Sequence, residues 1–327
     1  MSDRVAHMSR APKQKGQTNS GKFKKKLRFI AGKWQLYVFL LLPLMYIVIF
    51  AYVPMTGLQL AFKRFQANLG VWGSPFIGFG NFRRFFTSHQ FSRVVGNTLK
   101  LSFYGLFAGF PIPIMLALIV NALRGSFTKR VAQTITYLPY FVSTVVLVGM
   151  LSQMLNPRIG VIPKLYTMFT GGSEMGNLIG SHIAFPHLYV WSGVWQSMGY
   201  SAIIYIAALS GASVELHDAA EIDGASRFKR VLHIDLPAIL PTASIMLILS
   251  AGQIMNVGFE KVFLMQNDMN IVASEVISTY IYKVGIASAT ADFAYGTTIG
   301  MFNSVINLIL IVTVNGINKR INESSLF

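Results

Sequence analysis

Long apolar runs alternate with short polar or charged segments along the chain. Six of these runs carry no charge over about 20 residues, the length that a helix needs to cross the hydrocarbon core of a bilayer. They are residues 34–54, 101–121, 131–156, 183–209, 238–259 and 293–315. The intervening residues 55–92 and 155–182 are interrupted by charges, Gly and Pro. The pattern therefore predicts an all-α, polytopic membrane protein with six transmembrane helices.

Composition supports this class. Hydrophobic residues make up 53% of the 327 residues and charged residues only 12%, where a soluble domain carries about 25% charged residues. The chain has no Cys, which excludes a disulfide framework, a thiolate zinc site and a cysteine nucleophile.

Charge is concentrated at the N-terminus. The net charge is +16, and residues 1–33 hold ten bases and one acid. This tail stops at Lys33 and runs directly into the first apolar segment, so we expect it to lie against anionic membrane lipid at the cytoplasmic face and not on nucleic acid. Six spans place both termini on one side. The prediction is a basic cytoplasmic tail (1–33), a transmembrane domain (34–315) and a cytoplasmic C-terminal tail (316–327).

The segment after the first span is basic and faces outside in this topology. It carries five bases and no acid when the base that follows residue 92 is included; these are Lys63, Arg64, Arg83, Arg84 and Arg93. They either attract an acidic partner or lie at the lipid headgroups, and we favour the second interpretation.

Residues 210–237, between the fourth and fifth spans, carry the most informative pattern. Ser213 is placed to cap a helix that holds acidic residues in its early turns, among them Asp218. Gly224 then breaks this helix. A second, basic helix is expected to end before Pro237, which also opens the fifth span.

This loop strongly resembles the signature of the permease subunits of ATP-binding-cassette importers, which reads E-A-A, three residues, Gly, nine residues, then I-x-L-P. The matching residues are Asp218, Ala219 and Ala220, then Gly224, then Ile234, Leu236 and Pro237. Asp218 replaces the Glu of the signature, which keeps the charge. Further segments look like the branch that handles oligosaccharides and polysaccharide fragments, namely PMTGLQLAFKRF, FIGFGNF, Asn97-Thr98 and YLPYFVSTVVLVGM.

The resemblance implies a permease subunit of the prokaryotic cytoplasmic (inner) membrane. Its partners would be a second permease, for which we favour a related chain over another copy, two ATPase subunits that bind ATP and Mg, and an extracytoplasmic solute-binding protein that delivers an oligosaccharide. The loop would couple the chain to the ATPases. The residues expected to do so are Glu215, Asp218, Ala219, Ala220, Asp223, Gly224, Ile234, Leu236 and Pro237.

Polar and aromatic residues within the spans are candidates for the substrate path. Gln253, Asn256 and Glu260 follow i, i+3, i+7 spacing, which predicts one helical face. The other candidates are Trp191, Trp195, Gln196, Tyr200 and Asn303. Asn and Gln also bond between helices, and Trp and Tyr form interfacial belts, so both interpretations stay open.

Catalytic motifs are absent from the sequence. The closest approach to a P-loop, Gly171 to Gly176, is followed by Asn177 and Leu178 instead of the Lys and Ser or Thr that phosphate and Mg²⁺ require. We expect no ATPase site, metal site or cofactor in this chain. Two other classes, an ion-coupled secondary sugar transporter and a membrane-embedded glycosyl enzyme, leave the 210–237 loop unexplained.

Overall fold

The computed structural model describes residues 32–211 and 213–322. The chain divides into two compact units, Met1–Gly57 and Leu58–Phe327. The predicted basic tail lies almost entirely outside the described residues, as do the last five residues of the predicted C-terminal tail.

The first unit is an apolar helix. It begins as α2 (Trp34–Ile47), widens into a π-helical turn (Val48–Tyr52) and ends as α3 (Val53–Met55). Every side chain from Trp34 to Met55 is exposed within the chain. A helix that is apolar on all sides suits lipid or another membrane helix as its surroundings.

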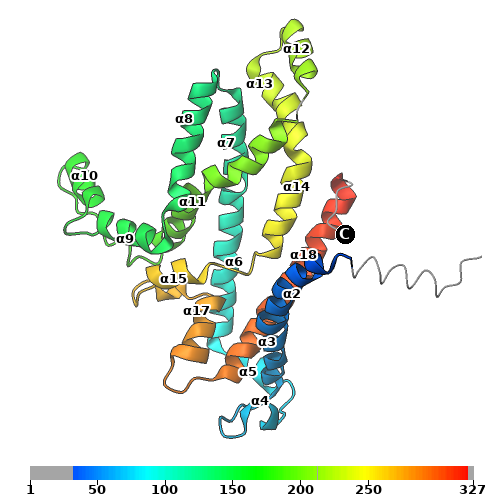
Figure 1. Ribbon diagram of the computed structural model, residues 1–327. Helices are drawn as coiled ribbons and strands as arrows, with labels where there is room; N and C mark the ends of the chain where they lie inside the picture. The colour runs from blue at the N-terminus through cyan, green and yellow to red at the C-terminus, as the bar shows by residue number, and fades with distance from the viewer. Residues whose placement is uncertain (1–31, 212, 323–327) are drawn as a thin grey trace, which may run out of the picture. The chain divides into compact units, whose positions relative to one another are not determined.

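The second unit is a set of helices joined by loops (Figure 1). Its longer helices are α6 (His89–Gly109), α7 (Pro111–Ala122), α8 (Ser126–Tyr137), α9 (Thr144–Met154), α11 (Ala184–Leu209), α14 (Leu236–Gly252) and α18 (Phe293–Asn322). The shorter helices are α4 (Gly70–Gly73), α5 (Gly80–Phe86), α10 (Val161–Phe169), α12 (Val214–Ile222), α13 (Arg227–Arg230), α15 (Phe259–Met265), α16 (Ile271–Ser274) and α17 (Ile277–Tyr282). Two 3₁₀ helices (Thr56–Phe62, which begins at the boundary with the first unit, and Leu138–Phe141) and two π-helical turns (Val231–Asp235 and Lys283–Ala287) complete the list.

Among the described residues of both units, four helical stretches are long and apolar enough to span a membrane, or up to six if each of two bent helix pairs is one span. The four are Trp34–Phe62, His89–Ala122, Arg227–Gly252 and Phe293–Ile317. The bent pairs are Ser126–Phe141 with Thr144–Met154, and α11 with α12. The predicted all-α polytopic class is confirmed.

Helix α11 organises the second unit, since it contacts α6, α7, α8, α14 and α15. Its buried residues join three separate apolar clusters, which contain Phe185, Val194 and Tyr205 respectively. Gly199 permits the closest approach: a Cβ atom there would lie 1.9 Å from the carbonyl oxygen of Thr136 in α8. The lack of a side chain therefore lets the two helix backbones touch.

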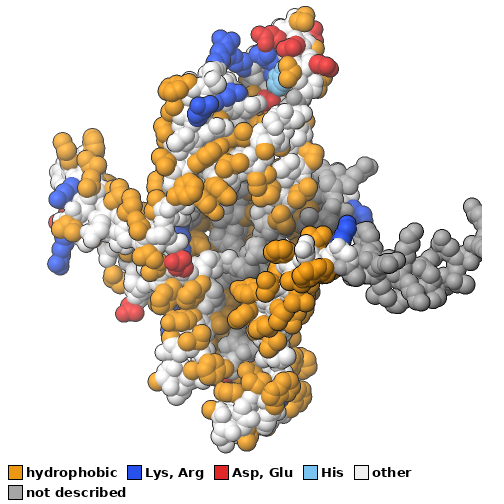
Figure 2. Space-filling model, in the orientation of Figure 1, with side chains coloured by type: hydrophobic (Ala, Val, Ile, Leu, Met, Phe, Trp, Pro, Cys, Tyr) orange, Lys and Arg blue, Asp and Glu red, His pale blue; other side chains and the backbone are white. Residues whose placement is uncertain are grey.

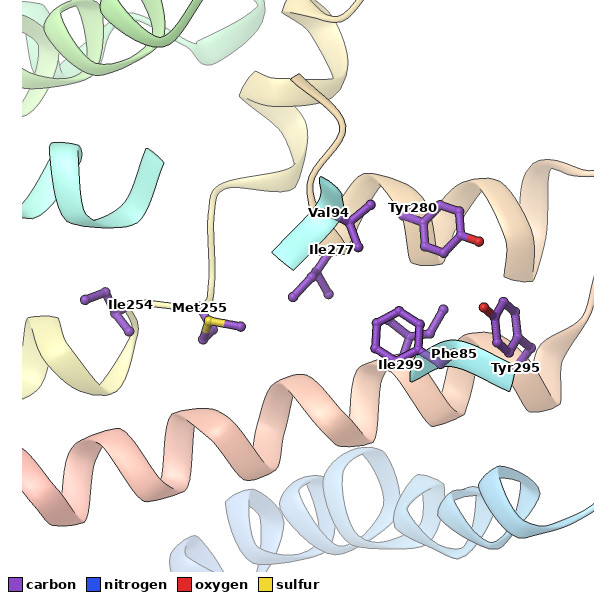
Figure 3. Close-up of a cluster of buried hydrophobic side chains, with 8 residues drawn as sticks. All are labelled: Phe85, Val94, Ile254, Met255, Ile277, Tyr280, Tyr295 and Ile299. Atoms are coloured by element: carbon purple, nitrogen blue, oxygen red, sulfur yellow. The ribbon is translucent and has the colours of Figure 1, made fainter. Parts of the chain in front are cut away.

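A fourth apolar cluster joins segments that are far apart in the sequence (Figure 3). Its buried members come from α5, α6, the segment after α14, α17 and α18; they are Phe85, Val94, Ile254, Met255, Ile277, Tyr280, Tyr295 and Ile299. Packing in this cluster therefore holds Ile254 and Met255, at the start of the segment 253–258. This segment forms part of the site described below.

The predicted third span is not one straight helix. Its two halves, Ser126–Phe141 and α9, meet at an angle of 94°. Val142 and Ser143 are extended, and the Ser143 hydroxyl caps α9 by accepting from the amide of Val146. Pro139 lies in the 3₁₀ helix before the bend and lacks the amide hydrogen that would continue an α-helix.

The predicted fifth span also ends early. Helix α14 stops at Gly252, and residues 253–258 lie outside any helix before α15 begins at Phe259. The second and sixth spans are longer than predicted, because α6 and α7 form one 34-residue stretch and α18 continues to Asn322. The fourth predicted span coincides closely with α11.

Candidate functional site

The loop 210–237 forms a helical elbow at one end of the second unit (Figure 1). The Ser213 hydroxyl accepts from the amide of Leu216 and begins α12 as predicted. Gly224 ends the helix with φ of +73°, a left-handed conformation that Gly adopts without a steric penalty. The Ser226 hydroxyl then caps α13. The capped acidic helix and the glycine break are therefore present where the pattern placed them.

The helix after the elbow differs from the prediction. It does not end before Pro237 but runs from α13 through the π-helical turn Val231–Asp235 into α14, and the whole stretch Arg227–Gly252 is one helical span. Pro237 lies in the first turn of α14, immediately after the π-helical turn. The π-helical turn already interrupts the regular i→i−4 hydrogen bonding at this point of the continuous helix, so the missing amide hydrogen of Pro237 is tolerated there.

Side-chain contacts tie α12 to this stem. His217 Nε2 donates to Asp235 Oδ1 over 3.1 Å, and Arg230 Nη1 donates to Glu221 Oε2 over 2.5 Å. Asn121, near the end of α7, donates to the same Asp235 oxygen over 3.4 Å. Asp235 is 3% exposed. Sequence reasoning missed it, because the signature leaves that position unspecified.

The rest of α12 is open to solvent. Glu215, Asp218 and Ala219 are exposed, and so is Ile222, at 87%. Figure 2 shows acidic side chains gathered at the α12 end of the unit, with Lys and Arg side chains beside them. Among the predicted coupling residues, Ala220, Ile234 and Leu236 are half-buried, while Asp223, Gly224 and Pro237 are exposed. The elbow thus presents a charged and partly apolar surface on a stem that continues into α14.

A cavity of about 370 Å³ lies between α6, α7, α11, α14 and the segment after α14. Its polar lining includes Ser102, Tyr189, Gln253 and Asn256 among apolar and glycine residues, and it contains no charged side chain. The Ser102 hydroxyl is buried without a hydrogen-bond partner. The cavity wall is therefore neutral and partly aromatic, with several groups that can form hydrogen bonds.

Carboxamide side chains form a network beside this cavity. Asn256 Nδ2 donates to Gln253 Oε1 over 2.7 Å. Asn256 Oδ1 accepts from the Nδ2 atoms of Asn303 and Asn307, each over 3.1 Å. Asn307 in turn accepts from the amide of Met255. Of these four side chains, Gln253 and Asn256 line the cavity. The network therefore ties the segment after α14 to α18 and also faces the hollow.

Glu260 does not join this group. The prediction of one helical face for Gln253, Asn256 and Glu260 is wrong, because the helix ends before Gln253 and Glu260 belongs to the first turn of α15. The next residue, Lys261, was missed: its Nζ donates to the carbonyl of Tyr189 over 2.8 Å. Burial lowers the pKa of Lys261 to about 8. Lys261 thus holds Tyr189, one of the residues that line the cavity.

The candidates on α11 face the bend in the predicted third span. Gln196 donates to the carbonyl of Val142 over 2.7 Å, and the Tyr200 ring stacks on Tyr140 with centroids 3.9 Å apart. Trp191 and Trp195 line a separate, almost wholly apolar hollow of about 520 Å³ next to α9. Within a membrane, a backbone carbonyl that a bend leaves without its partner in the helix needs another hydrogen-bond donor. Gln196 supplies this donor and so has a structural role.

Most of the basic residues after the first span have partners within the chain. Lys63 donates to the carbonyls of Val71 and Trp72, Arg84 pairs with Asp292 at 2.7 Å, and Arg93 pairs with Glu275. Glu275 is 2% exposed and also contacts Lys283. Neither an external acidic partner nor lipid headgroups are needed to explain these three bases. The acidic partners of Arg84 and Arg93 lie about 200 residues further along the chain, beyond the reach of local patterns.

Within the described residues, no group of three or more His, Cys, Asp or Glu side chains is placed to hold a metal ion. The two histidines of the elbow form hydrogen bonds within the chain. His217 bonds to Asp235, and His233 Nδ1 lies 3.0 Å from the carbonyl of Lys229 in its own helix.

Residues 109–323 match the family described as binding-protein-dependent transport system inner membrane component. The chain is 39% identical to Protein LplB of Bacillus subtilis over 90% of this chain and 91% of that protein. It is 36% identical to the polygalacturonan/rhamnogalacturonan transport system permease protein YteP of the same organism, over 92% of each chain.

Solved structures agree. A chain of a bacterial ABC transporter that imports the acidic polysaccharide alginate superposes with a TM-score of 0.83 at 35% identity, covering 91% of this chain and 99% of that one. A second structure, of a bacterial alginate ABC transporter in complex with an alginate pentasaccharide-bound periplasmic protein, gives the same TM-score at 34% identity and the same coverage.

Proposed function

The chain belongs to the family of binding-protein-dependent transport system inner membrane components, and on that premise we propose that it forms half of an oligosaccharide path driven by separate ATPases. The family match spans the elbow, α14 and α18, and the relative YteP is a permease protein of a polygalacturonan/rhamnogalacturonan transport system. This membership favours an ABC permease over a secondary transporter or a glycosyl enzyme.

The elbow supports the coupling part of the proposal. An exposed, capped helix whose sequence follows the importer signature stands on a stem that continues without a break into α14. Small side chains at Ala219 and Ala220 permit close approach of a groove on an ATPase subunit. Closure of two ATPase subunits on ATP and Mg would then tilt the stem.

The cavity supports the path part. Its lining offers hydrogen-bond donors and acceptors next to aromatic and glycine surfaces, which matches the hydroxyls and flat faces of a sugar. The path would be completed by a second permease, for which a related chain is favoured. A solute-binding protein would deliver the oligosaccharide at the end opposite the elbow.

The proposed setting is a bacterial inner membrane with the elbow and both termini in the cytoplasm. The basic N-terminal residues carry this orientation. The outer end would then contain α5, the beginning of α18 and the ion pairs of Arg84 and Arg93.

Reconstitution of the whole transporter tests the function. The chain, its partner permease and the ATPase subunits would be placed in proteoliposomes holding ATP and Mg, and the binding protein added outside. A panel of galacturonate, alginate and neutral arabinose oligosaccharides would be assayed for uptake and ATP hydrolysis. We expect uptake of at least one member that requires both ATP and the binding protein.

Liposomes loaded with ADP are the matched control and should show no uptake. Uptake that persists with ADP and follows an imposed proton or sodium gradient would contradict the proposal and favour ion coupling.

A further inference from the structure

Two links of different burial tie α12 to its stem. His217 and Glu221 are four residues apart in α12 and share one face of the helix. Their partners, Asp235 and Arg230, are five residues apart in the stem. In an α-helix that spacing would turn the two side chains about 140° away from each other. The wider π-helical turn Val231–Asp235 brings them toward a common face.

The inner link is the stronger one. The side chains of His217 and Asp235 are 27% and 4% exposed, whereas Glu221 in the outer link is 68% exposed. Exposed ion pairs contribute little to stability, while a buried acceptor that loses its donor is penalised. Asp235 also accepts from Asn121, so α12, the stem and α7 meet at one carboxylate.

The backbone alone would leave α12 free to pivot. Between Ile222 and Arg227 the chain makes a tight turn with Gly224 in a left-handed conformation, and no apolar residue of α12 is buried. The position of α12 relative to the two spans therefore depends on these polar side chains.

We propose that His217 and Asp235 form a latch that makes α12 and its stem one rigid lever, and that Asn121 extends the same lever to α7. Both side chains are positioning residues: they transmit the displacement of α12 to α14 and α7 and need not touch an ATPase subunit. The inference rests on the proposed function, since a lever is useful only if α12 is the part that the ATPases move.

The test is the ratio of oligosaccharide imported to ATP hydrolysed by the full reconstituted complex, with the panel member that the wild type imports fastest. His217→Ala should lower this ratio at least threefold while the complex continues to hydrolyse ATP. His217→Asn, whose amide is too short to reach Asp235, should lower it equally. His217→Gln places an N–H donor near the Nε2 position and should restore the ratio to within about 1.5-fold of wild type.

His233→Ala is the matched control. This second histidine lies on the stem and forms a hydrogen bond to the carbonyl of Lys229 in its own helix, so the ratio should stay at the wild-type value. Asp235→Asn retains an oxygen that accepts from His217 and should also behave like wild type.

Two results would overturn the latch while leaving the proposed function intact. One is a wild-type ratio in assembled His217→Ala and His217→Asn complexes. The other is a parallel fall of uptake and ATP hydrolysis together with a lower unfolding temperature, which indicates a purely structural role. If the wild-type complex itself shows no ATP-dependent uptake, the proposed function fails and the latch fails with it.

Discussion

Four carboxamide side chains beside the cavity could serve in helix packing, in substrate binding or in both, and the sequence alone cannot separate these roles. Each Asn or Gln side chain is both donor and acceptor, so the same group can bond a neighbouring helix or a sugar hydroxyl. The contacts show Asn256 at the centre, bonded to Gln253, Asn303 and Asn307. Only two of the four, Gln253 and Asn256, are among the cavity-lining residues.

This arrangement separates the two roles experimentally. Gln253→Leu and Asn303→Leu each remove one hydrogen bond to Asn256, so both should lower the free energy of unfolding by about 0.5–1.5 kcal/mol. Only Gln253→Leu also removes a polar group from the cavity wall, where an unpaired sugar hydroxyl costs about 1–3 kcal/mol, or roughly fivefold to hundredfold in affinity. Uptake at low oligosaccharide concentration should therefore fall much further for Gln253→Leu.

Thermal unfolding of the two purified complexes provides the control for stability. Equal losses of uptake in the two variants would show that the network only holds helices together.

The sequence predicted some residues of the elbow but not its most buried one. Ser213 and Gly224 act locally, through a cap and a turn, and local chemistry can be read from neighbouring letters. Asp235 and Glu275 matter because of partners brought by folding, Asn121 and Arg93 respectively. The residues next to Asp235 and Glu275 in the sequence do not indicate that these two side chains are buried.

At the scale of helices, the apolar runs indicated where helices lie. They did not indicate where a helix ends inside an apolar run. Val142–Ser143 and residues 253–258 are as free of charge as the helices beside them, so the predicted third and fifth spans ran straight through. In both places a carboxamide side chain of another helix supplies a bond: Gln196 of α11 donates to the carbonyl of Val142, and Asn307 of α18 accepts from the amide of Met255. The broken helices are therefore sustained by contacts with other elements.

Contact between α8 and α11 leads to a prediction about helix packing. A Cβ atom at Gly199 would fall 1.9 Å from the backbone of α8, so Gly199→Ala must push the helices apart. We expect a loss of about 1–3 kcal/mol in unfolding free energy, measured as a lower unfolding temperature of the purified complex. Gly149→Ala in α9 meets no atom within 4 Å and should be neutral or stabilising by up to about 1 kcal/mol.

At the scale of the whole molecule, the family membership and the superposition on an alginate importer agree with the architecture inferred from apolar runs and one signature. Orientation in the membrane is the remaining prediction at this scale. It depends on the basic residues before Trp34, because the rest of the chain carries nearly balanced bases on its two sides.

Labelling tests this orientation cleanly, since the chain has no native Cys. A single cysteine at Ser213 should stay unlabelled by a membrane-impermeant maleimide in sealed cells and react once the cells are opened. A cysteine at Thr290, at the opposite end beside Asp292, should react in sealed cells. The reverse pattern would place the elbow outside and refute the proposed orientation.

The π-helical turn Val231–Asp235 also sets the rotation of the following helix, α14, about its own axis. Removing one residue from this turn would leave α14 intact yet rotate it by about 100° about its own axis and draw it back by about 1.5 Å. Met246 and Ser250, which line the cavity, would then face other neighbours, although the residues on either side of them in the sequence would be unchanged. The number of residues between Gly224 and Pro237 is thus a length constraint in its own right: it determines which face of the spanning helix looks into the cavity.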